Sequence, residues 1–234
     1  MGVTGKVLMK KDRLLLNRNE IIRYLGYKDQ EPDEIMLEEI KICEDEFYKV
    51  MVPKFYYEVF DIKREGERLM LSDESFEFLG GDIKKHLNGC DKVAFSCATL
   101  SEGVDELIDQ AQKVDMLMAF IYDAIANAVV EEVRAKAETS VASAYPDYFC
   151  NWQYGIGYGD LPLSLQPLFL NRINAKEKIG LTCNERCLLV PLKPVTGFIG
   201  LSKKVQKNSG CNQRSCLTCK NKEQCIYRNN DMEH

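Results

Sequence analysis

The sequence predicts a mixed α/β fold, because segments with strand character and segments with helix character alternate along most of the chain. Lys54–Ile62 is β-branched and aromatic, as is typical of a strand, and Lys92–Thr99 is an apolar run typical of a strand buried on both faces. A segment from about Val114 to Glu138 is apolar nearly all round in its first four turns and charged in its last. We therefore expect a long helix that runs through the middle of a core.

Two helices are predicted before the first of these strands. A short helix around 19–25 should end at Gly26, because glycine readily adopts the left-handed conformation that closes a helix. A longer helix can begin at Asp33, whose carboxylate is a good cap. Its apolar residues recur at steps of three and four and form one stripe: Met36, Ile40, Cys43, Phe47 and Val50. Residues 28–46 hold nine acids and two lysines, which we interpret as the solvated face of this helix.

The remaining elements are shorter. Between the two main strands we expect a weak strand at Arg68–Leu71, a turn at Gly80-Gly81, and a short helix capped by Asp82 that ends near Asn88. Ser101 with Glu102 opens a helix ahead of the long one. The C-terminal half adds one helix near 163–173 and three strands, at 148–154, 187–190 and 196–201.

The chain divides at about residue 202. From Lys203 onward it turns polar and loses its apolar periodicity, and residues 203–228 hold seven bases and one acid. We therefore place one main domain at residues 1–202 and a cysteine-rich, metal-binding tail at residues 203–234.

Composition excludes several classes of function. The 31 basic and 36 acidic residues give a net charge of −5, which argues against a dedicated nucleic-acid-binding protein. No apolar stretch reaches the ~18 residues that span a bilayer, and the first residues lack the apolar segment of a secretion signal. We expect a soluble, cytoplasmic protein with no nucleic-acid and no membrane partner. Its only histidines are His86, on an exposed-looking helix, and His234, so a Ser–His or Cys–His hydrolase is disfavoured.

A glycine-rich run from Gln153 to Pro162 is the most specific motif of the main domain. Its three glycines, at 155, 157 and 159, remove the side chains along one edge of what we expect to be an extended backbone. Such a backbone can lie flat against a ligand and offer its N–H and C=O groups. A purely structural corner of the fold would have the same appearance.

Two polar residues interrupt the long apolar helix. Asp123 and Asn127 are four positions apart and therefore lie on the same face. Buried polar groups need partners, since an unpaired one costs ~1–3 kcal/mol. Either the two belong to an internal hydrogen-bond network that fixes the helix, or they form the polar wall of a ligand pocket.

At this point the sequence resembles a known family. The run from Gly157 to Leu163 (Gly-Tyr-Gly-Asp-Leu-Pro-Leu) is similar to a motif of the activation domain of cobalamin-dependent methionine synthase, and more closely to the shorter, free-standing bacterial relatives of that domain. The resemblance spans roughly residues 15–202. The other matching segments are 23–27, 98–100, 104–105, 179–182, 184–185, Pro191 and 195–197.

The resemblance implies an α/β fold with a twisted, largely antiparallel sheet and a groove for S-adenosylmethionine. In the full enzyme that domain presents S-adenosylmethionine to a corrinoid whose cobalt has become inactive Co(II), and a one-electron reduction coupled to methyl transfer restores methylcobalamin. The cofactors supply this chemistry, and the protein supplies position and electrostatics. Cobalamin would be reached only through a partner, either a corrinoid-binding protein or a methionine synthase subunit.

The resemblance also implies site residues, with two departures. Gly157 and Tyr158 match the family motif and would line the groove, but Gln153 stands where the family has an arginine that pairs with the ligand carboxylate. A bidentate contact of ~1.5–3 kcal/mol is therefore missing at that position. On the long helix Asp123 matches the family, whereas Asn127 stands at an acidic position.

The tail carries an independent chemical pattern. Cys211, Cys216, Cys219 and Cys225 are separated by four, two and five residues, and four thiols in a polar segment predict a metal site. The part from Cys216 to Cys225 is similar to a half-motif of auxiliary domains that hold four-iron clusters, so we favour an iron–sulfur cluster over zinc. The basic residues around these thiols would lower the cost of gathering their negative charge.

The other cysteines favour structural roles. Cys43, Cys90, Cys97 and Cys150 lie among apolar neighbours, as small buried side chains do. Cys183 and Cys187 could form a second thiol pair, but we prefer core packing for them.

Three hypotheses for function follow. The first is an accessory protein of corrinoid-dependent methyl transfer that binds S-adenosylmethionine and docks a corrinoid protein for reductive reactivation, whether or not it is itself part of the methyltransferase. The second is a docking or scaffold subunit that no longer binds the small molecule, motivated by Gln153 and Asn127. The third is an iron–sulfur electron-transfer protein.

Overall fold

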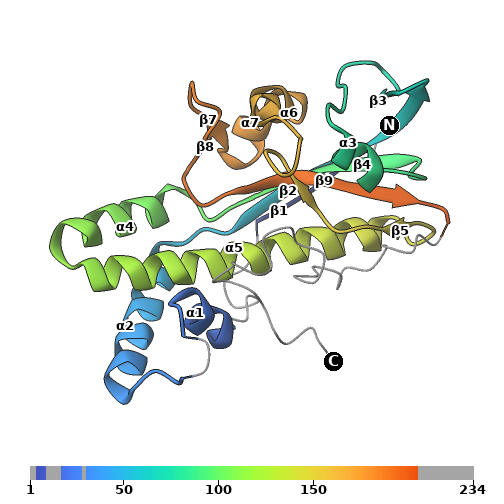
Figure 1. Ribbon diagram of the computed structural model, residues 1–234. Helices are drawn as coiled ribbons and strands as arrows, with labels where there is room; N and C mark the ends of the chain where they lie inside the picture. Colours follow the sequence, from blue (N-terminus) through green and yellow to red (C-terminus); the bar gives the residue numbers. More distant parts are fainter. Residues whose placement is uncertain (1–3, 9–16, 28–29, 205–234) are drawn as a thin grey trace.

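A computed structural model describes residues 4–8, 17–27 and 30–204 (Figure 1). Its main sheet has seven strands in the order β1-β2-β4-β9-β5, with β3 beside β2 and β6 beside β9. Every pair in it is antiparallel, so the mixed α/β fold with an antiparallel sheet is confirmed. The strands are β1 (Thr4–Leu8), β2 (Lys54–Glu65), β3 (Arg68–Leu71), β4 (Lys92–Thr99), β5 (Phe149–Cys150), β6 (Tyr154–Gly155) and β9 (Val195–Ser202). A separate hairpin pairs β7 (Thr182–Cys183) with β8 (Leu189–Val190).

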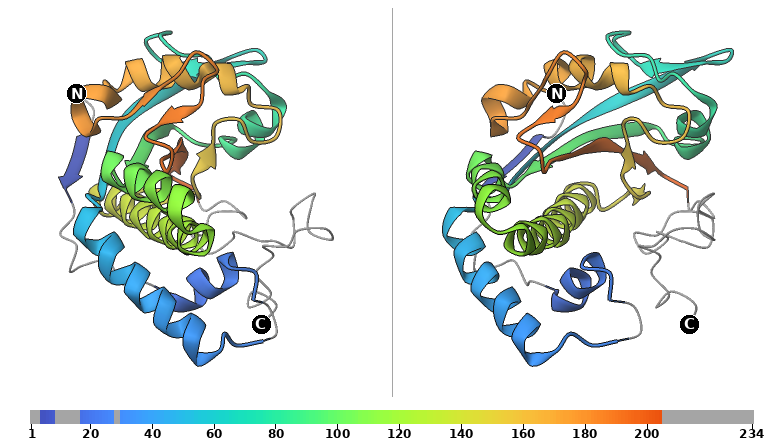
Figure 2. Two further views of the ribbon diagram at one scale, coloured as in Figure 1. Left: turned by 90° about the vertical axis from the view of Figure 1, so that its left-hand side faces the viewer. Right: turned by 60° about the vertical axis from the view of Figure 1, so that its left-hand side comes forward.

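Helices cover both faces of the sheet (Figures 1 and 2). The long helix α5 lies along one face beside α4, with α1 and α2 on its outer side, and the opposite face carries α3, α6 and α7. The helices are α1 (Arg18–Tyr24), α2 (Glu34–Val50), α3 (Gly81–His86), α4 (Glu102–Val114), α5 (Met116–Ala144), α6 (Gln166–Arg172) and α7 (Ala175–Ile179). This arrangement creates two hydrophobic cores, one on each face of the sheet.

The second core is built mainly from aromatic rings. Phe95 of β4 is fully buried, and the ring of Phe169 stacks on it with centroids 5.0 Å apart. Phe198 of β9 meets Phe95 edge-on at 4.8 Å. Tyr154 and Ile156 belong to the same core, so the aromatic packing holds the start of the glycine-rich segment in place.

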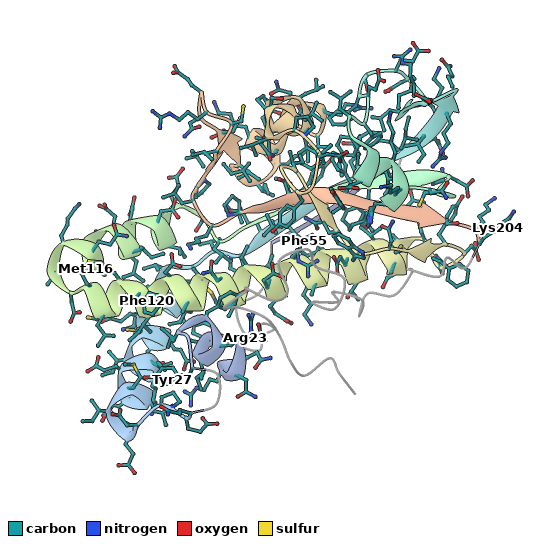
Figure 3. All side chains as sticks on the ribbon, viewed as in Figure 1. Arg23, Tyr27, Phe55, Met116, Phe120 and Lys204 are labelled. Atoms are coloured by element: carbon teal, nitrogen blue, oxygen red, sulfur yellow. The ribbon has the colours of Figure 1, made fainter. Side chains whose placement is uncertain are left out.

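Most of the predicted elements are confirmed, with shifts at their ends. Helix α1 ends just before Gly26, which has a φ of 92°, and Asp33 caps α2 by accepting a hydrogen bond from the Met36 N–H at 2.8 Å. Helix α5 starts later than expected and continues to Ala144. The start of α5 is only partly buried: Met116 is 68% and Phe120 51% exposed, near the end of α4 (Figure 3).

The single strand expected at 148–154 is wrong. Two short strands, β5 and β6, both pair with β9, and residues 151–153 between them belong to neither strand. Asn151 remains bonded to Gly200 of β9: its backbone N–H donates to the Gly200 carbonyl at 3.0 Å, and its Oδ1 accepts from the Gly200 N–H at 2.5 Å. The backbone N–H of Gln153 turns away from the sheet and donates to Oε1 of Glu138 on α5, at 2.9 Å. A contact with a distant helix therefore interrupts the strand.

No helix within the described ranges has the length and apolar character that a membrane crossing requires.

Candidate functional site

A cavity of about 510 Å³ opens where α5 faces the edge strand β6. Residues of α1, α5, β6, β8 and β9 line it, together with the 3₁₀ turn Leu163–Leu165 and the start of α6; α1, α5, α6, β8 and β9 are labelled in Figure 1. Its aromatic lining comes from Tyr24, Trp152 and Tyr158. The size lies within the range of ~300–1,000 Å³ that is usual for small-molecule sites.

The polar wall of the cavity is an ion cluster on α5. Arg134 donates through Nε to Glu131 at 3.0 Å and through Nη1 to Glu138 one turn further along. Arg134 and Glu138 are each only 5% exposed, although they lie towards the end of the helix, which the sequence indicates is charged. Burial raises the pKa of the Glu138 carboxyl, and Arg134 acts in the opposite direction. A buried ion cluster is stable only if hydrogen bonds satisfy its charged groups, and the Gln153 N–H supplies one of these bonds to Glu138.

Two buried amides complete the wall. Gln153 is 6% exposed, and neither its Oε1 nor its Nε2 has a hydrogen-bond partner within the described residues. Gln166 is 1% exposed; its Oε1 accepts from Thr196 at 3.0 Å, and its Nε2 has no partner in the same part of the chain. Both side chains line the cavity. Buried polar groups are normally paired, so these amides leave hydrogen-bonding capacity at the cavity wall.

A glycine allows Gln153 to occupy this position. Gly197 of β9 lies opposite Gly155 in the sheet, and a Cβ at Gly197 would come within 2.8 Å of Cγ of Gln153 and 2.4 Å of the Tyr154 carbonyl oxygen. Only glycine at 197 lets the edge strand and the Gln153 side chain approach β9 so closely.

The expectation of an extended backbone through the glycine run is wrong. After β6 the chain makes two consecutive turns, closed by hydrogen bonds from the Tyr158 N–H to the Gly155 carbonyl and from the Leu161 N–H to the Tyr158 carbonyl. Gly157 and Gly159 have φ values of 86° and 55°, which favour glycine. The turns place Tyr158 at the rim of the cavity, 67% exposed, whereas Gly157 is exposed but not among the lining residues.

Asp160, next in the motif, has a structural role. Its carboxylate accepts hydrogen bonds from the backbone N–H of Gly81 at 2.6 Å and of Asp82 at 3.0 Å, and so caps α3 from a distant part of the chain. The predicted cap, Asp82, lies inside the helix instead. The Asp82 and Gly81 N–H groups lower the pKa of Asp160. This interaction ties the glycine-rich turns to α3, which packs in the same core.

Asp123 and Asn127 lie apart from the polar wall. Asn127 donates to Asp123 at 3.0 Å, and Lys193, in the loop before β9, contacts both, at 2.5 Å from Asp123 and 3.1 Å from Asn127. Asn127 lines a second cavity of about 350 Å³, which shares Tyr24, Glu131, Pro194 and Val195 with the first, and Asp123 lines neither. The pair therefore forms a hydrogen-bond network that links α5 to the loop before β9, and Asn127 also borders the second cavity.

The remaining predicted residues fall elsewhere. Cys211, Cys216, Cys219 and Cys225 lie outside the described residues, and within those residues no group of three or more metal-binding side chains is found. Cys43, Cys90 and Cys97 are buried as expected. Core packing is wrong for Cys187, which lies in the β7–β8 turn with a φ of 61° and lines the main cavity.

His86 is not the exposed residue that the sequence indicates. Its ring contacts Trp152 at 4.6 Å and Tyr154 at 5.2 Å, on either side of Gln153 in the chain, and its Nε2 is buried with no partner among the described residues. Burial lowers the pKa of His86 to about 4.

Sequence reasoning missed Arg134 as a cavity residue, Glu138 as its buried partner, and Gln166 as a further cavity residue. The sequence does contain a sign that Arg134 and Glu138 are buried. Val133, Ala137 and Val141 continue the apolar face of α5 past these two residues. Charged residues set into a continuing apolar face are buried more often than those at a helix end.

The fold and this edge cavity define an open-sheet α/β domain with helices on both faces. The chain has the fold of the MetH reactivation domain. A crystal structure described as that domain bound to AdoHcy superimposes with a TM-score of 0.66 and 13% sequence identity, over 88% of this chain and 81% of the other. No family model matches the chain, and no curated protein matches its sequence.

Proposed function

We propose that the main cavity binds S-adenosylmethionine or its demethylated product, S-adenosylhomocysteine. The observation that carries the proposal is the set of buried, unpartnered amide atoms of Gln153 and Gln166 that face the cavity. Such atoms favour a polar ligand, since each one left unpaired costs ~1–3 kcal/mol. The structural neighbour was crystallised with AdoHcy, and Tyr24, Trp152 and Tyr158 offer aromatic surface for an adenine ring.

The wider role we propose is accessory: the protein would present this ligand to a corrinoid carried by a partner protein and take part in reductive reactivation of the cobalt. The neighbour's description as a reactivation domain and the motif from Gly157 to Leu163 support this role. The chain's own residues would bind and orient the ligand at an open edge of the fold, where Tyr158 at the rim is accessible to a second protein.

Calorimetry tests the small-molecule part. We expect S-adenosylhomocysteine to bind, and Tyr158→Ala to weaken binding by roughly 5- to 100-fold, the loss typical of removing one aromatic stacking surface. Phe149→Ala is the matched control, because Phe149 is an exposed aromatic on the same sheet edge that lines neither this cavity nor its neighbour. It should bind like the parent protein.

Absence of heat at millimolar ligand would remove the small-molecule proposal and favour the docking subunit. The variant Gln153→Arg then separates the two hypotheses. If that variant gains binding where the parent has none, the cavity is an inherited shape and docking is the surviving function.

For the tail we propose a metal site formed by Cys211, Cys216, Cys219 and Cys225, with an iron–sulfur cluster preferred over zinc because a cluster could deliver the electron that reactivation needs. Protein purified without oxygen should contain iron and absorb visible light, and replacing Cys216 and Cys219 with serine should remove both. A colourless protein that contains zinc would reject the electron-transfer role and leave a structural one.

A further inference from the structure

The cavity contains a buried cation for which the resemblance to the methionine synthase domain does not account. The family places its ligand-binding arginine at position 153, directly before the edge strand β6, and this chain has Gln153 there. On the opposite wall, Arg134 of α5 lines the same cavity. The two residues share a partner, because Glu138 accepts from the Arg134 guanidinium and from the Gln153 backbone N–H.

Arg134 has hydrogen-bonding capacity left for a ligand. A guanidinium carries five N–H groups, and the described residues use two of them, Nε–H toward Glu131 and one Nη1–H toward Glu138. The neighbouring amides add Nε2 of Gln153 and Nε2 of Gln166, each unpartnered among the described residues. These donors converge on one cavity, and a carboxylate, which only accepts hydrogen bonds, is the ligand group that satisfies them.

An acceptor is available beside these donors. Oε1 of Gln153 is buried and lacks a partner among the described residues, so it is suited to an N–H donor such as an ammonium group. Glu131 and Glu138 flank Arg134, so this wall is not purely cationic. Donors and an acceptor side by side match the carboxylate and ammonium of an α-amino acid better than a phosphate or sulfate, which would offer acceptors only.

We infer that Arg134 binds the α-carboxylate of an amino-acid-bearing ligand, with Gln153 bridging to its ammonium group, so that the charge the family carries directly before the edge strand has moved to the helix. Glu138 acts as a positioning residue that holds the guanidinium and the Gln153 backbone together. The inference rests on the proposed function, since it specifies how the amino-acid end of S-adenosylmethionine is recognised.

The test compares two ligands that differ only in the carboxylate: S-adenosylmethionine and its decarboxylated analogue, which keeps the ammonium and sulfonium groups. The parent protein should bind S-adenosylmethionine roughly 10- to 100-fold more tightly than the analogue, because the analogue cannot form the charge-assisted hydrogen bonds to a carboxylate. In Arg134→Gln this preference should fall to about one, because S-adenosylmethionine loses affinity while the analogue binds as well as before or better. Retained binding of the analogue also demonstrates that the variant is folded.

Lys136→Gln is the matched control. It removes one positive charge from an exposed position of the same helix, where Lys136 pairs only with Glu132 among the described residues, and the ligand preference should not change. If Arg134→Gln does not fold because Glu138 loses its counter-ion, Arg134→Gln with Glu138→Gln removes both buried charges, and the same loss of preference is expected.

A transposition gives the converse test. Arg134→Gln combined with Gln153→Arg returns the charge to the position before the edge strand and should restore at least tenfold preference for S-adenosylmethionine. The inference is overturned if Arg134→Gln weakens both ligands equally, if it weakens neither, or if the transposed variant still shows no preference. Failure of the proposed function looks different, because the parent protein would then bind neither ligand.

Discussion

Replacing Phe95 with alanine should lower the free energy of unfolding by about 3–5 kcal/mol, the usual cost of deleting a buried aromatic ring. Phe95 is fully buried at the centre of the aromatic core, with Phe60, Phe76 and Phe198 edge-on to it at 4.8–5.0 Å and Phe169 stacked at 5.0 Å. No single neighbour can fill the space that its ring leaves. Urea denaturation followed by circular dichroism measures the change.

Phe149→Ala is the control for this prediction, since Phe149 is 45% exposed and its removal should cost less than about 1 kcal/mol. A loss below about 1 kcal/mol for Phe95→Ala as well would contradict the placement of Phe95 at the centre of a close-packed core. Because Tyr154 and Ile156 belong to this core, Phe95→Ala should also weaken ligand binding.

Stability should fall as the pH is lowered from about 6.5 to 4, and His86 should account for much of the loss. Burial lowers its pKa to about 4 in the folded protein, whereas an unfolded chain has a value near 6.5. The unfolded chain therefore takes up the proton first, so the stabilisation is complete above pH 6.5 and disappears as the pH approaches 4. The shift corresponds to about 3 kcal/mol.

The comparison with His86→Phe isolates this effect. Phenylalanine keeps a ring against Trp152 and Tyr154 but has no group that titrates, so the difference in unfolding free energy between the two proteins should change by about 3 kcal/mol across this pH range. Carboxylates titrate in both proteins and cancel. A difference that stays constant with pH would mean that the His86 ring takes up its proton without leaving its site.

Periodicity alone was sufficient to predict the elements whose environment is uniform. Helix α2 has one apolar stripe, β4 is buried along nearly its whole length, and both were found close to their expected ends. These patterns depend only on which side of an element faces water, which the order of residues encodes directly.

The features missed depend on residues far apart in the chain. Asp160 caps a helix 78 and 79 positions away, and Glu138 draws the Gln153 N–H out of the strand. His86 is enclosed by Trp152 and Tyr154, which no local pattern connects with it. Arg134 was missed for a different reason: a charged residue in the later part of a helix is usually solvated, and only the packing of α5 against the sheet buries it.

The place of β9 in the sheet has a consequence for biosynthesis. It is the last strand of the described chain, yet it lies between β4 and the edge strands β5 and β6. While the ribosome has made only the first 190 residues, β2 and β4 can already pair and α5 can pack, but β5 and β6, on either side of Trp152 and Gln153, have no strand to pair with. The proposed ligand site is thus completed only once residues 195–202 are made, and a nascent chain stalled before them leaves the edge of β4 unpaired.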